Sequence, residues 1–424
     1  MKTEKEKELI KKTVLPSGVR VITENLPYLH SVAFGIFFNH GARDESPQEQ
    51  GIAHLLEHMF FKGTTKRSAK EISIFAESKG TIIDGFTSKE STGIYARFLA
   101  ENFSPIAELA CEIVSSPALA ENELTKEKMV IAEEIKSNQE DPEDQMLNLL
   151  FRALYEPHPM GNSVTGTIET LMTFKRETLY NYYKTNYSKT NAIVVGVGEI
   201  SHEELCAKIE KELVLNSSPS FNSRNKPEAK TPTYQIENRK ELTQVYVAMA
   251  KPVFSFQDER RYALSVLNTA LGGGVSSRLF QRLREEEGLV YTIASFVDLF
   301  FDSGVLGIYF ITDYKKFSQG VTACLDEISK LRKERFTKEE FATALNLTKS
   351  SILLGLENPS SRMMRLAKNE ILLNRIITIE ETLAAYNRLT VDAVNELLPL
   401  VLPDNCFFMS CVGPLQEKDL EPFF

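Results

Sequence analysis

Two histidines and a glutamate lie close together at residues 54–58, where the sequence is His-Leu-Leu-Glu-His. In a helix, side chains three and four positions apart are neighbours, so His54 and His58 can direct two imidazole nitrogens at one metal ion, with Glu57 on the same side. The intervening leucines fall on the opposite side, where they would pack against a hydrophobic core. Imidazole is a common zinc ligand, and a nearby carboxylate can act as a general base. The spacing therefore predicts a zinc-dependent hydrolytic site on a helix.

A catalytic zinc ion needs a third protein ligand, because residues 54–58 supply only two histidines. Such ions take three protein ligands and leave the fourth position to water, so the third ligand must come from elsewhere in the chain. The pattern His-x-x-Glu-His is typical of the inverzincin metallopeptidases. The alternative is that the two histidines are hydrogen-bonded core residues of a helix that binds no metal. The expected helix and the presence of third-ligand candidates favour zinc.

The residues around this motif resemble the family of pitrilysin, insulysin and mitochondrial processing peptidase, which are zinc endopeptidases. Residues 41–65 are GARDESPQEQGIAHLLEHMFFKGTT, with the family's Gly-Ser/Ala-Arg-x-Glu turn before the motif and its Met-x-Phe-x-Gly-Thr segment after it. Farther along, Glu127 and Glu134 match two glutamates of a family helix, and seven residues span two turns, so they share a face. By the resemblance, Glu134 is the third zinc ligand, and Glu127 orients the site without touching the metal.

The segment that carries these two glutamates could instead be an ordinary charged amphipathic helix. The need for a third ligand favours the metal role for Glu134, whereas the role of Glu127 is less directly indicated. Glu133 points about 100 degrees away from Glu134 and is expected at the surface.

A second segment, residues 271–291, also resembles the family. It reads LGGGVSSRLFQRLREEEGLVY, a glycine-rich loop followed by Arg-x6-Tyr. By the resemblance, Arg284 and Tyr291 contact the substrate or the tetrahedral intermediate, where such donors stabilise charge on the scissile carbonyl oxygen. The alternative is that Arg284 joins its charged neighbours in a surface cluster. The glycines do not indicate a nucleotide site, because no Gly-Lys-Ser/Thr follows; they could let another backbone come close, either a peptide substrate or a packed loop.

Two further segments bear on the resemblance. Residues 158–169 contain the family's His-Pro-x-Gly and Gly-x-x-Glu, and His158 is expected to be a structural loop residue because zinc already has three candidate ligands. Residues 80–87 are Gly-Thr-Ile-Ile-Asp-Gly-Phe-Thr, where the family usually has Gly-Gly-x-x-Asn-Ala-x-Thr. An ionised Asp84 can only accept hydrogen bonds, whereas the Asn also donates them, so the substrate preference near this strand stays open.

The length and charge of the chain limit its class. At 424 residues it exceeds a single typical core, so two domains of about 200 residues each are expected. The net charge of -9 argues against nucleic acid as the main partner. Its cysteines are odd in number, lie mostly in apolar runs and are expected to be reduced core residues. They are Cys111, Cys206, Cys324, Cys406 and Cys411.

The N-terminal residues 1–12, MKTEKEKELIKK, alternate in charge and contain no apolar stretch. They match neither a signal peptide nor a transit peptide, which is poor in acidic residues. The chain contains no run of eighteen apolar residues that could cross a membrane. A cytoplasmic location is expected, although a processed organellar form would look the same.

The elements that must position these residues fall into two halves. Residues 216–232, NSSPSFNSRNKPEAKTP, interrupt the apolar periodicity and are predicted to link a zinc-binding catalytic domain, 1–215, to a second related domain, 233–424. The first half has strand-like runs at 12–23 and 31–38 and helical runs near 47–62, 68–79, 102–115 and 121–154. The second half has strand-like runs at 234–236 and 245–249 and helical runs at 258–271, 276–286, 315–332 and 337–354.

The order of these runs predicts the fold class. Alternating hairpin-like segments at 81–98 and 295–312, among helices, indicate α+β architecture with antiparallel sheets. The resemblance implies the same: two structurally related domains, each a mainly antiparallel sheet backed by helices, which together form half of a clamshell.

The expected activity is zinc-dependent hydrolysis of peptide bonds in short or unfolded peptides or in precursor leader segments. One zinc ion per chain, held by His54, His58 and Glu134, would acidify its water, and Glu57 would take the proton and return it to the leaving amine. The peptide would lie extended along an edge strand of the zinc domain. Precursor processing and general peptide degradation are not separated by the sequence.

The resemblance also bears on partners. Relatives of this length pair two chains, and this chain carries both the zinc set and the glycine-rich segment. A homodimer is therefore expected, in which Arg284 and Tyr291 complete the site of the opposite subunit, with peptides as substrates and with no nucleic acid or membrane partner. The alternative is a non-catalytic scaffold or peptide-binding subunit beside an active sister chain, which the complete zinc set disfavours.

Overall fold

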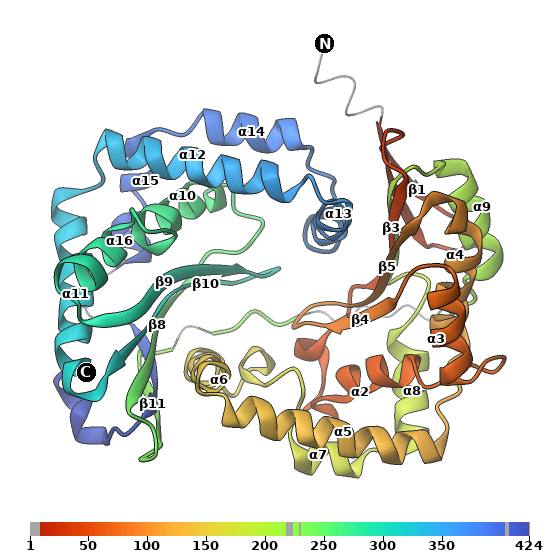
Figure 1. Ribbon diagram of the computed structural model, residues 1–424, viewed down its shortest axis with the longest axis horizontal. Helices are drawn as coiled ribbons and strands as arrows, with labels where there is room; N and C mark the ends of the chain where they lie inside the picture. Colours follow the sequence, from red (N-terminus) through yellow and green to blue (C-terminus); the bar gives the residue numbers. More distant parts are fainter. Residues whose placement is uncertain (1–8, 218–223, 229, 403–406, 424) are drawn as a thin grey trace. The chain divides into compact units, whose positions relative to one another are not determined.

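The computed structural model describes residues 9–217, 224–228, 230–402 and 407–423, and these form two compact units (Figure 1). Each unit has its own sheet and its own apolar core. Unit 1 comprises residues 1–136, 163–224 and 354–378, and unit 2 comprises 137–162, 225–353 and 379–424. One division, at 224/225, falls inside the predicted linker 216–232, of which 218–223 and 229 lie outside the described residues.

Unit 1 contains a six-stranded sheet in the order β1-β2-β6-β3-β5-β4. Its strands are β1 (Ile10–Val14), β2 (Arg20–Asn25), β3 (Ser31–Phe38), β4 (Ile83–Thr87), β5 (Thr92–Leu99) and β6 (Ala192–Gly198). Every pair is antiparallel except β2 with β6. The middle strands β3 and β6 are almost wholly buried because both faces of the sheet are covered there, whereas β4 ends the sheet and is half exposed.

Helices pack on both faces of this sheet. On one face, α4 contacts β3 and β5 and α9 contacts β2; on the other, α13 contacts β3 and β6. The helices of unit 1 are α2 (Ile52–Phe60), α3 (Ala69–Ser78), α4 (Phe103–Ser115), α5 (Glu121–Glu140, of which the last four residues fall in unit 2), α7 (Ile168–Thr173), α8 (Arg176–Asn186), α9 (His202–Glu212) and α13 (Pro359–Leu373).

Unit 2 contains a five-stranded sheet in the order β7-β11-β8-β10-β9. Its strands are β7 (Tyr234–Asn238), β8 (Gln244–Val253), β9 (Val290–Leu299), β10 (Gly304–Asp313) and β11 (Phe408–Gly413). The pairing of β7 with β11 is parallel and the others are antiparallel. This order repeats β2-β6-β3-β5-β4 of unit 1, including the parallel pair, so the prediction of two related, mainly antiparallel domains is confirmed.

The helices of unit 2 also cover both faces of their sheet. Helix α6 packs against β8 and β11, while α10 contacts β9 and α11 contacts β10. The helical elements of this unit are α6 (Pro142–Tyr155), α10 (Arg261–Gly272), a π-helix η5 (Phe280–Glu286), α11 (Phe317–Glu334), α12 (Lys338–Gly355, of which the last two residues fall in unit 1), α14 (Ile379–Asn387), α15 (Val391–Asn395) and α16 (Leu398–Val401).

Two predicted segments are each divided in two. The helical run 121–154 stops at Glu140, because Asp141 caps a new helix at the backbone N–H groups of Glu143 and Asp144, and Pro142 occupies its first position. The strand-like run 12–23 is broken into β1 and β2 by a turn in which Gly18 has a φ of 92°.

The structure bears on two further predictions, that the cysteines are reduced core residues and that no segment spans a membrane. Cys111, Cys324 and Cys411 are buried free thiols and Cys206 is a half-buried one, whereas Cys406 lies outside the described residues. None of the helices in the described part of the chain has the length and apolarity needed to span a bilayer.

Candidate metal centre

The helix with the His-x-x-Glu-His motif is α2. It begins after Gly51, whose φ of 89° lies in the left-handed region. Leu55 and Leu56, together with Met59, are fully buried in the core of unit 1. This buried side fixes the rotation of the helix, so that the histidines and Glu57 face away from the core, as predicted.

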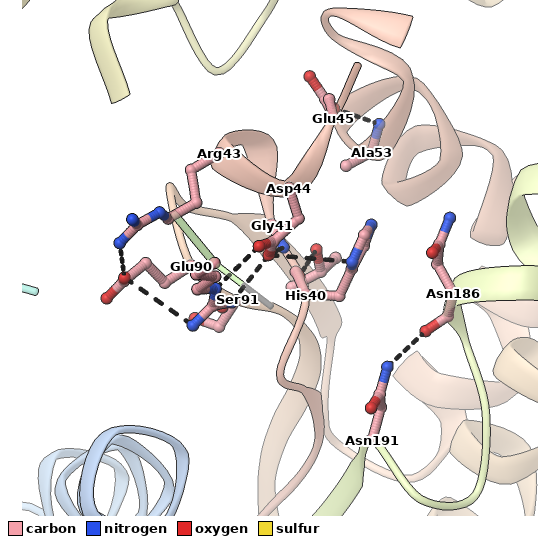
Figure 2. Close-up of polar contacts among 12 residues, drawn as sticks. His40, Gly41, Arg43, Asp44, Glu45, Ala53, Glu90, Ser91, Asn186 and Asn191 are labelled. Carbon is pink, nitrogen blue, oxygen red and sulfur yellow. Dashed lines mark hydrogen bonds and ion pairs between the residues drawn. The ribbon is translucent and has the colours of Figure 1, made fainter. Parts of the chain in front are cut away.

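The N-terminus of α2 is capped from a distance. The side chain of Glu45 accepts a hydrogen bond from the backbone N–H of Ala53 at 2.9 Å (Figure 2). It also accepts one from the backbone N–H of Gly51 at 2.8 Å. These are among the helix amides that have no partner within the helix. Burial raises the pKa of Glu45 to about 8, against the lowering effect of the two hydrogen bonds.

The turn before α2 is tied into a buried ionic network. Arg43 donates to Glu90, and Asp44 accepts from the backbone N–H of Gly41 at 3.0 Å (Figure 2). The guanidinium of Arg224 donates to both carboxylate oxygens of Asp44, each at 2.8 Å. The Gly-Ala-Arg-Asp-Glu turn therefore holds the start of α2 in place and supplies no group to the metal site.

Three side chains of unit 1 converge in front of α2. The Nε2 atom of His54 lies 3.6 Å from one carboxylate oxygen of Glu134, and the Nε2 atom of His58 lies 3.6 Å from the other. One ligand atom from each of the three side chains lies within 4.8 Å of the others. Glu134 reaches this position from α5, with Glu127 two turns earlier on the same face.

The chemistry of this set fits a zinc ion. Ligands about 2.0–2.1 Å from one tetrahedral zinc ion are roughly 3.4 Å apart, close to the 3.6 Å that separates Glu134 from each histidine. Burial, with a smaller effect from His58, lowers the pKa of His54 to about 4, which keeps this imidazole neutral and able to bind a metal. The Glu134 side chain is 38% exposed, so the centre is open on one side, as a catalytic zinc site requires.

Glu127 orients one of the two histidines. Its carboxylate lies 3.1 Å from Nδ1 of His58, and its other oxygen accepts from the ammonium group of Lys62 at 2.8 Å. A hydrogen bond at Nδ1 leaves Nε2 of His58 free to bind a metal. His54 is held differently, because its Nδ1 is buried and has no hydrogen-bond partner among the described residues. Glu133 is exposed and pairs with Lys136 at 2.7 Å, as expected for a surface residue.

Glu57 lies between the metal-binding side chains and strand β4. The hydroxyl of Thr87 donates to its carboxylate at 2.7 Å. At Gly85 the strand passes so close that an added Cβ would lie 2.8 Å from Cγ of Glu57. Burial raises the pKa of Glu57, while the Thr87 hydrogen bond opposes the rise. The carboxylate is thus desolvated and oriented, which suits a general base.

Arg284 and Tyr291 lie in unit 2, on η5 and β9. Tyr291 is 71% exposed, and the guanidinium of Arg284 lies over the ring of Phe280, 5.0 Å from its centre. Within the described parts of the chain, neither makes a side-chain hydrogen bond or an ion pair, so Arg284 stands apart from the pairing of Arg282 with Glu287.

The glycine-rich loop is partly explained by packing. An added Cβ would lie 2.6 Å from the backbone nitrogen of Ser295 at Gly272 and 2.6 Å from Cα of Thr269 at Gly273. Gly274 has nothing within 4 Å of such an atom. Two of the three glycines therefore permit close backbone contacts inside unit 2.

The motif at 158–169 has a structural explanation. His158 belongs to unit 2, and its ring accepts a hydrogen bond from the backbone N–H of Met160 at 3.1 Å. Gly166 has a φ of 72°, and an added Cβ would lie 2.4 Å from the carbonyl oxygen of Gln50. This glycine lets its loop press against the turn that precedes α2.

Sequence reasoning assigned no role to Thr87, Lys62 or Glu45, although each contacts a site residue or caps its helix. Thr87 belongs to the segment 80–87, in which only Asp84 was expected to affect the substrate. Glu45 belongs to the Gly-Ala-Arg-Asp-Glu turn, but its capping role depends on a loop of five residues that no helical spacing predicts. Lys62 lies just after the end of α2 and pairs with Glu127 of α5, a contact between distant segments that no local spacing predicts.

Comparisons with known proteins show the family of this chain. Residues 20–168 match the family model described as insulinase, peptidase family M16, and residues 173–348 match the model described as peptidase M16 inactive domain. An uncharacterized zinc protease of Bacillus subtilis is 35% identical over 92% of this chain and 95% of its own length. Another, of Streptomyces coelicolor, is 32% identical over 96% of this chain and 90% of its own length.

Solved structures show the same fold. A protease from Helicobacter pylori has a TM-score of 0.87 and 21% identity, covering 96% of this chain and 99% of that one. A peptidase M16 inactive domain from Pseudomonas fluorescens has a TM-score of 0.89 and 19% identity, covering 96% and 98%. At these identities the likeness concerns the fold alone.

Proposed function

Because this chain belongs to the M16 family of pitrilysin-like peptidases, we propose that it is a zinc metalloendopeptidase that hydrolyses peptide bonds in short or unfolded peptides or precursor leader segments. The observation that carries the proposal is the convergence of His54, His58 and Glu134, with the desolvated carboxylate of Glu57 beside them. Arrangements of this kind serve hydrolysis by an activated water molecule.

The residues of the site have three different roles in the proposed reaction. His54, His58 and Glu134 would hold the metal, which when bound supplies Lewis-acid polarisation of the scissile carbonyl and of a nearby water molecule. Glu57 takes a proton from the attacking water and delivers it to the leaving amine. Thr87 holds one oxygen of Glu57 and thereby fixes the direction of the other.

The substrate is best accommodated along β4. In the described part of unit 1 this strand pairs with β5 alone, so its outer edge can accept a peptide as an added strand. Gly85 and Thr87 of the same strand adjoin Glu57, which would place such a peptide next to the base. Main-chain hydrogen bonds along an edge bind with little demand on sequence, in keeping with flexible peptide substrates.

The test replaces the base and a ligand separately. Glu57→Gln should retain stoichiometric zinc and the thermal stability of the wild type but lower kcat by about a hundred- to ten-thousandfold, the usual contribution of general-base catalysis. Glu134→Ala should lose zinc. Metal analysis by mass spectrometry beside cleavage of a mixed peptide library measures both. A fully active Glu57→Gln protein, or full zinc in Glu134→Ala, contradicts the assignment.

A non-catalytic subunit is the second candidate. The match of residues 173–348 to a domain described as inactive favours it, although this match lies outside the zinc-binding residues. The same experiment separates the two functions, because a scaffold subunit would release no products from the library even when zinc is bound.

A further inference from the structure

Asp84 is an exposed carboxylate on the edge strand β4, one residue before Gly85. Side chains alternate along a strand, so Asp84 and Phe86 point to the face opposite Gly85 and Thr87, which adjoin Glu57. Asp84 is paired across the ladder with Tyr95, and the ring of Phe86 lies 6.2 Å from that of Tyr95. Within the described residues Asp84 takes part in no ion pair or side-chain hydrogen bond. Its charge is therefore available to a ligand.

A pocket lies directly beside this carboxylate. It has a volume of about 490 Å³ and belongs wholly to unit 1. Its lining residues are Glu77, Gly80, Thr81, Ile82, Asp84, Tyr95, Ala96, Arg97 and Ser360. The pocket thus combines a half-exposed aromatic ring with two carboxylates and one guanidinium.

Two of the charged residues of this pocket, Asp84 and Arg97, lie on the paired strands β4 and β5. Ile83 pairs with Ala96 and Asp84 with Tyr95, so Arg97 lies beyond the start of β4, farther along the strand from the Glu57 contacts than Asp84 is. Burial, and then the charges of Asp84 and Glu57, raise the pKa of Tyr95, so both carboxylates act on this ring. Of the two charged strand residues that line this pocket, Asp84 is the nearer one to Gly85, which adjoins Glu57.

We propose that Asp84 is a specificity residue that selects peptides with a lysine or arginine side chain facing it across the edge of β4. The inference rests on the proposed peptidase function. A peptide strand added to β4 places the residue opposite Asp84 on the same face as this carboxylate. Because Asp84 lies between the added strand and Tyr95 on β5, the charged end of lysine or arginine can pair with Asp84 and face the Tyr95 ring behind it. The facing residue lies within a few positions of the scissile bond, because Gly85 adjoins the base.

The test uses a set of peptides that differ at one position at a time, with lysine, glutamine or glutamate there. The wild type should show, at one position close to the cleaved bond, a kcat/KM about tenfold higher for lysine than for glutamine, the size of one charge-assisted hydrogen bond. Asp84→Asn should remove this ratio, and Asp84→Lys should favour glutamate. Glu101→Gln removes an exposed carboxylate elsewhere in unit 1 and should keep the wild-type ratio.

Binding distinguishes failure of this inference from failure of the proposed function. Fluorescence anisotropy of the labelled peptides is measured with Glu57→Gln and with the double variant Glu57→Gln/Asp84→Asn. A lysine preference that the double variant loses supports the subsite even if the wild type cleaves nothing. Cleavage with the same charge ratio in wild type, Asp84→Asn and Asp84→Lys overturns the subsite and leaves the peptidase assignment intact. Absence of both cleavage and binding overturns both.

Discussion

The two histidines of the motif are held in unequal ways. His58 contacts Glu127, which is itself neutralised by Lys62, whereas Nδ1 of His54 is buried without a partner in the described residues. Carboxylates that hold a ligating imidazole fix its orientation and strengthen its binding. Orientation of the metal set therefore depends mainly on one glutamate.

Replacement of this glutamate should weaken the site measurably. Glu127→Gln is expected to lower zinc affinity by about 10- to 100-fold, because the amide holds His58 less firmly and leaves Lys62 without its counter-charge. Zinc competition with a chelator of known affinity measures the change.

The matched control is Glu133→Gln on the same helix, whose partner is the exposed Lys136. It should bind zinc as the wild type does. Equal affinities for the wild type and Glu127→Gln would leave Glu127 with no part in the metal site.

At the scale of residues, spacing predicted which side chains come together but not what holds them. Residues three, four or seven positions apart lie on the same face of a helix. The sequence could therefore predict that His54 lies beside His58 and that Glu127 and Glu134 share a helix face. That Glu134 belongs beside the histidines came from the resemblance to a family. The contact of Thr87 with Glu57 joins a strand to a helix thirty residues away, and no local pattern encodes it.

At the scale of elements, α2 owes its placement to loops that touch it from outside. Gly166 and Gly51 approach each other so closely that an added Cβ at Gly166 would lie 2.8 Å from Cα of Gly51. Thr170 also donates to the carbonyl oxygen of Gln50 at 2.9 Å. The loop before α7 and the first turn of α7 thereby support the start of the metal-binding helix.

Two glycines with nearly the same φ test this support. Gly166→Ala, at φ 72°, is expected to lower the free energy of unfolding by about 2–4 kcal/mol, because it adds a backbone clash to the cost of a left-handed alanine. Gly80→Ala, at φ 70° with nothing within 4 Å, should cost only about 1–2 kcal/mol. Urea unfolding followed by circular dichroism measures both. Equal losses would show that the contact with the turn adds nothing.

Most long helices and the two hairpins follow from apolar periodicity, and their ends follow from caps. The break at Asp141-Pro142 could have been predicted from the capping side chain and the proline, since both are local signals. The central strands β6 and β11 were not identified. They are buried throughout, so they lack the alternation that marks a half-buried strand.

At the scale of the whole molecule, the glycine-rich segment and the zinc set occupy different units. Exposed donors at Arg284 and Tyr291 without partners in the described residues suit a role in binding a substrate. A homodimer whose subunits complete each other's sites predicts that a mixture of two inactive variants regains activity.

Glu57→Gln and Arg284→Ala should each be inactive alone. If sites are completed by the opposite subunit, a mixture of the two variants should recover up to about a quarter of wild-type activity after subunit exchange, since random pairing gives half mixed dimers with one intact site each. Exchange is verified by native mass spectrometry with isotope-labelled chains. Exchanged but inactive mixtures would place both sets of residues in the same chain's site.

The assignment of helices to sheets could not be foreseen from the sequence. Helix α6 precedes the predicted linker yet packs on the sheet of unit 2, and α13 follows the linker yet packs on the sheet of unit 1. Their amphipathic patterns show that each buries one side but do not say against which sheet.

This exchange of α6 and α13 means that the chain cannot be separated into independent modules by one cut. A fragment ending near residue 224 would carry α6 with no surface to cover, and its own sheet would lack α13. The complementary fragment would have the converse defect. During synthesis, unit 1 therefore cannot complete its fold until α13, which lies near the end of the chain, has been translated.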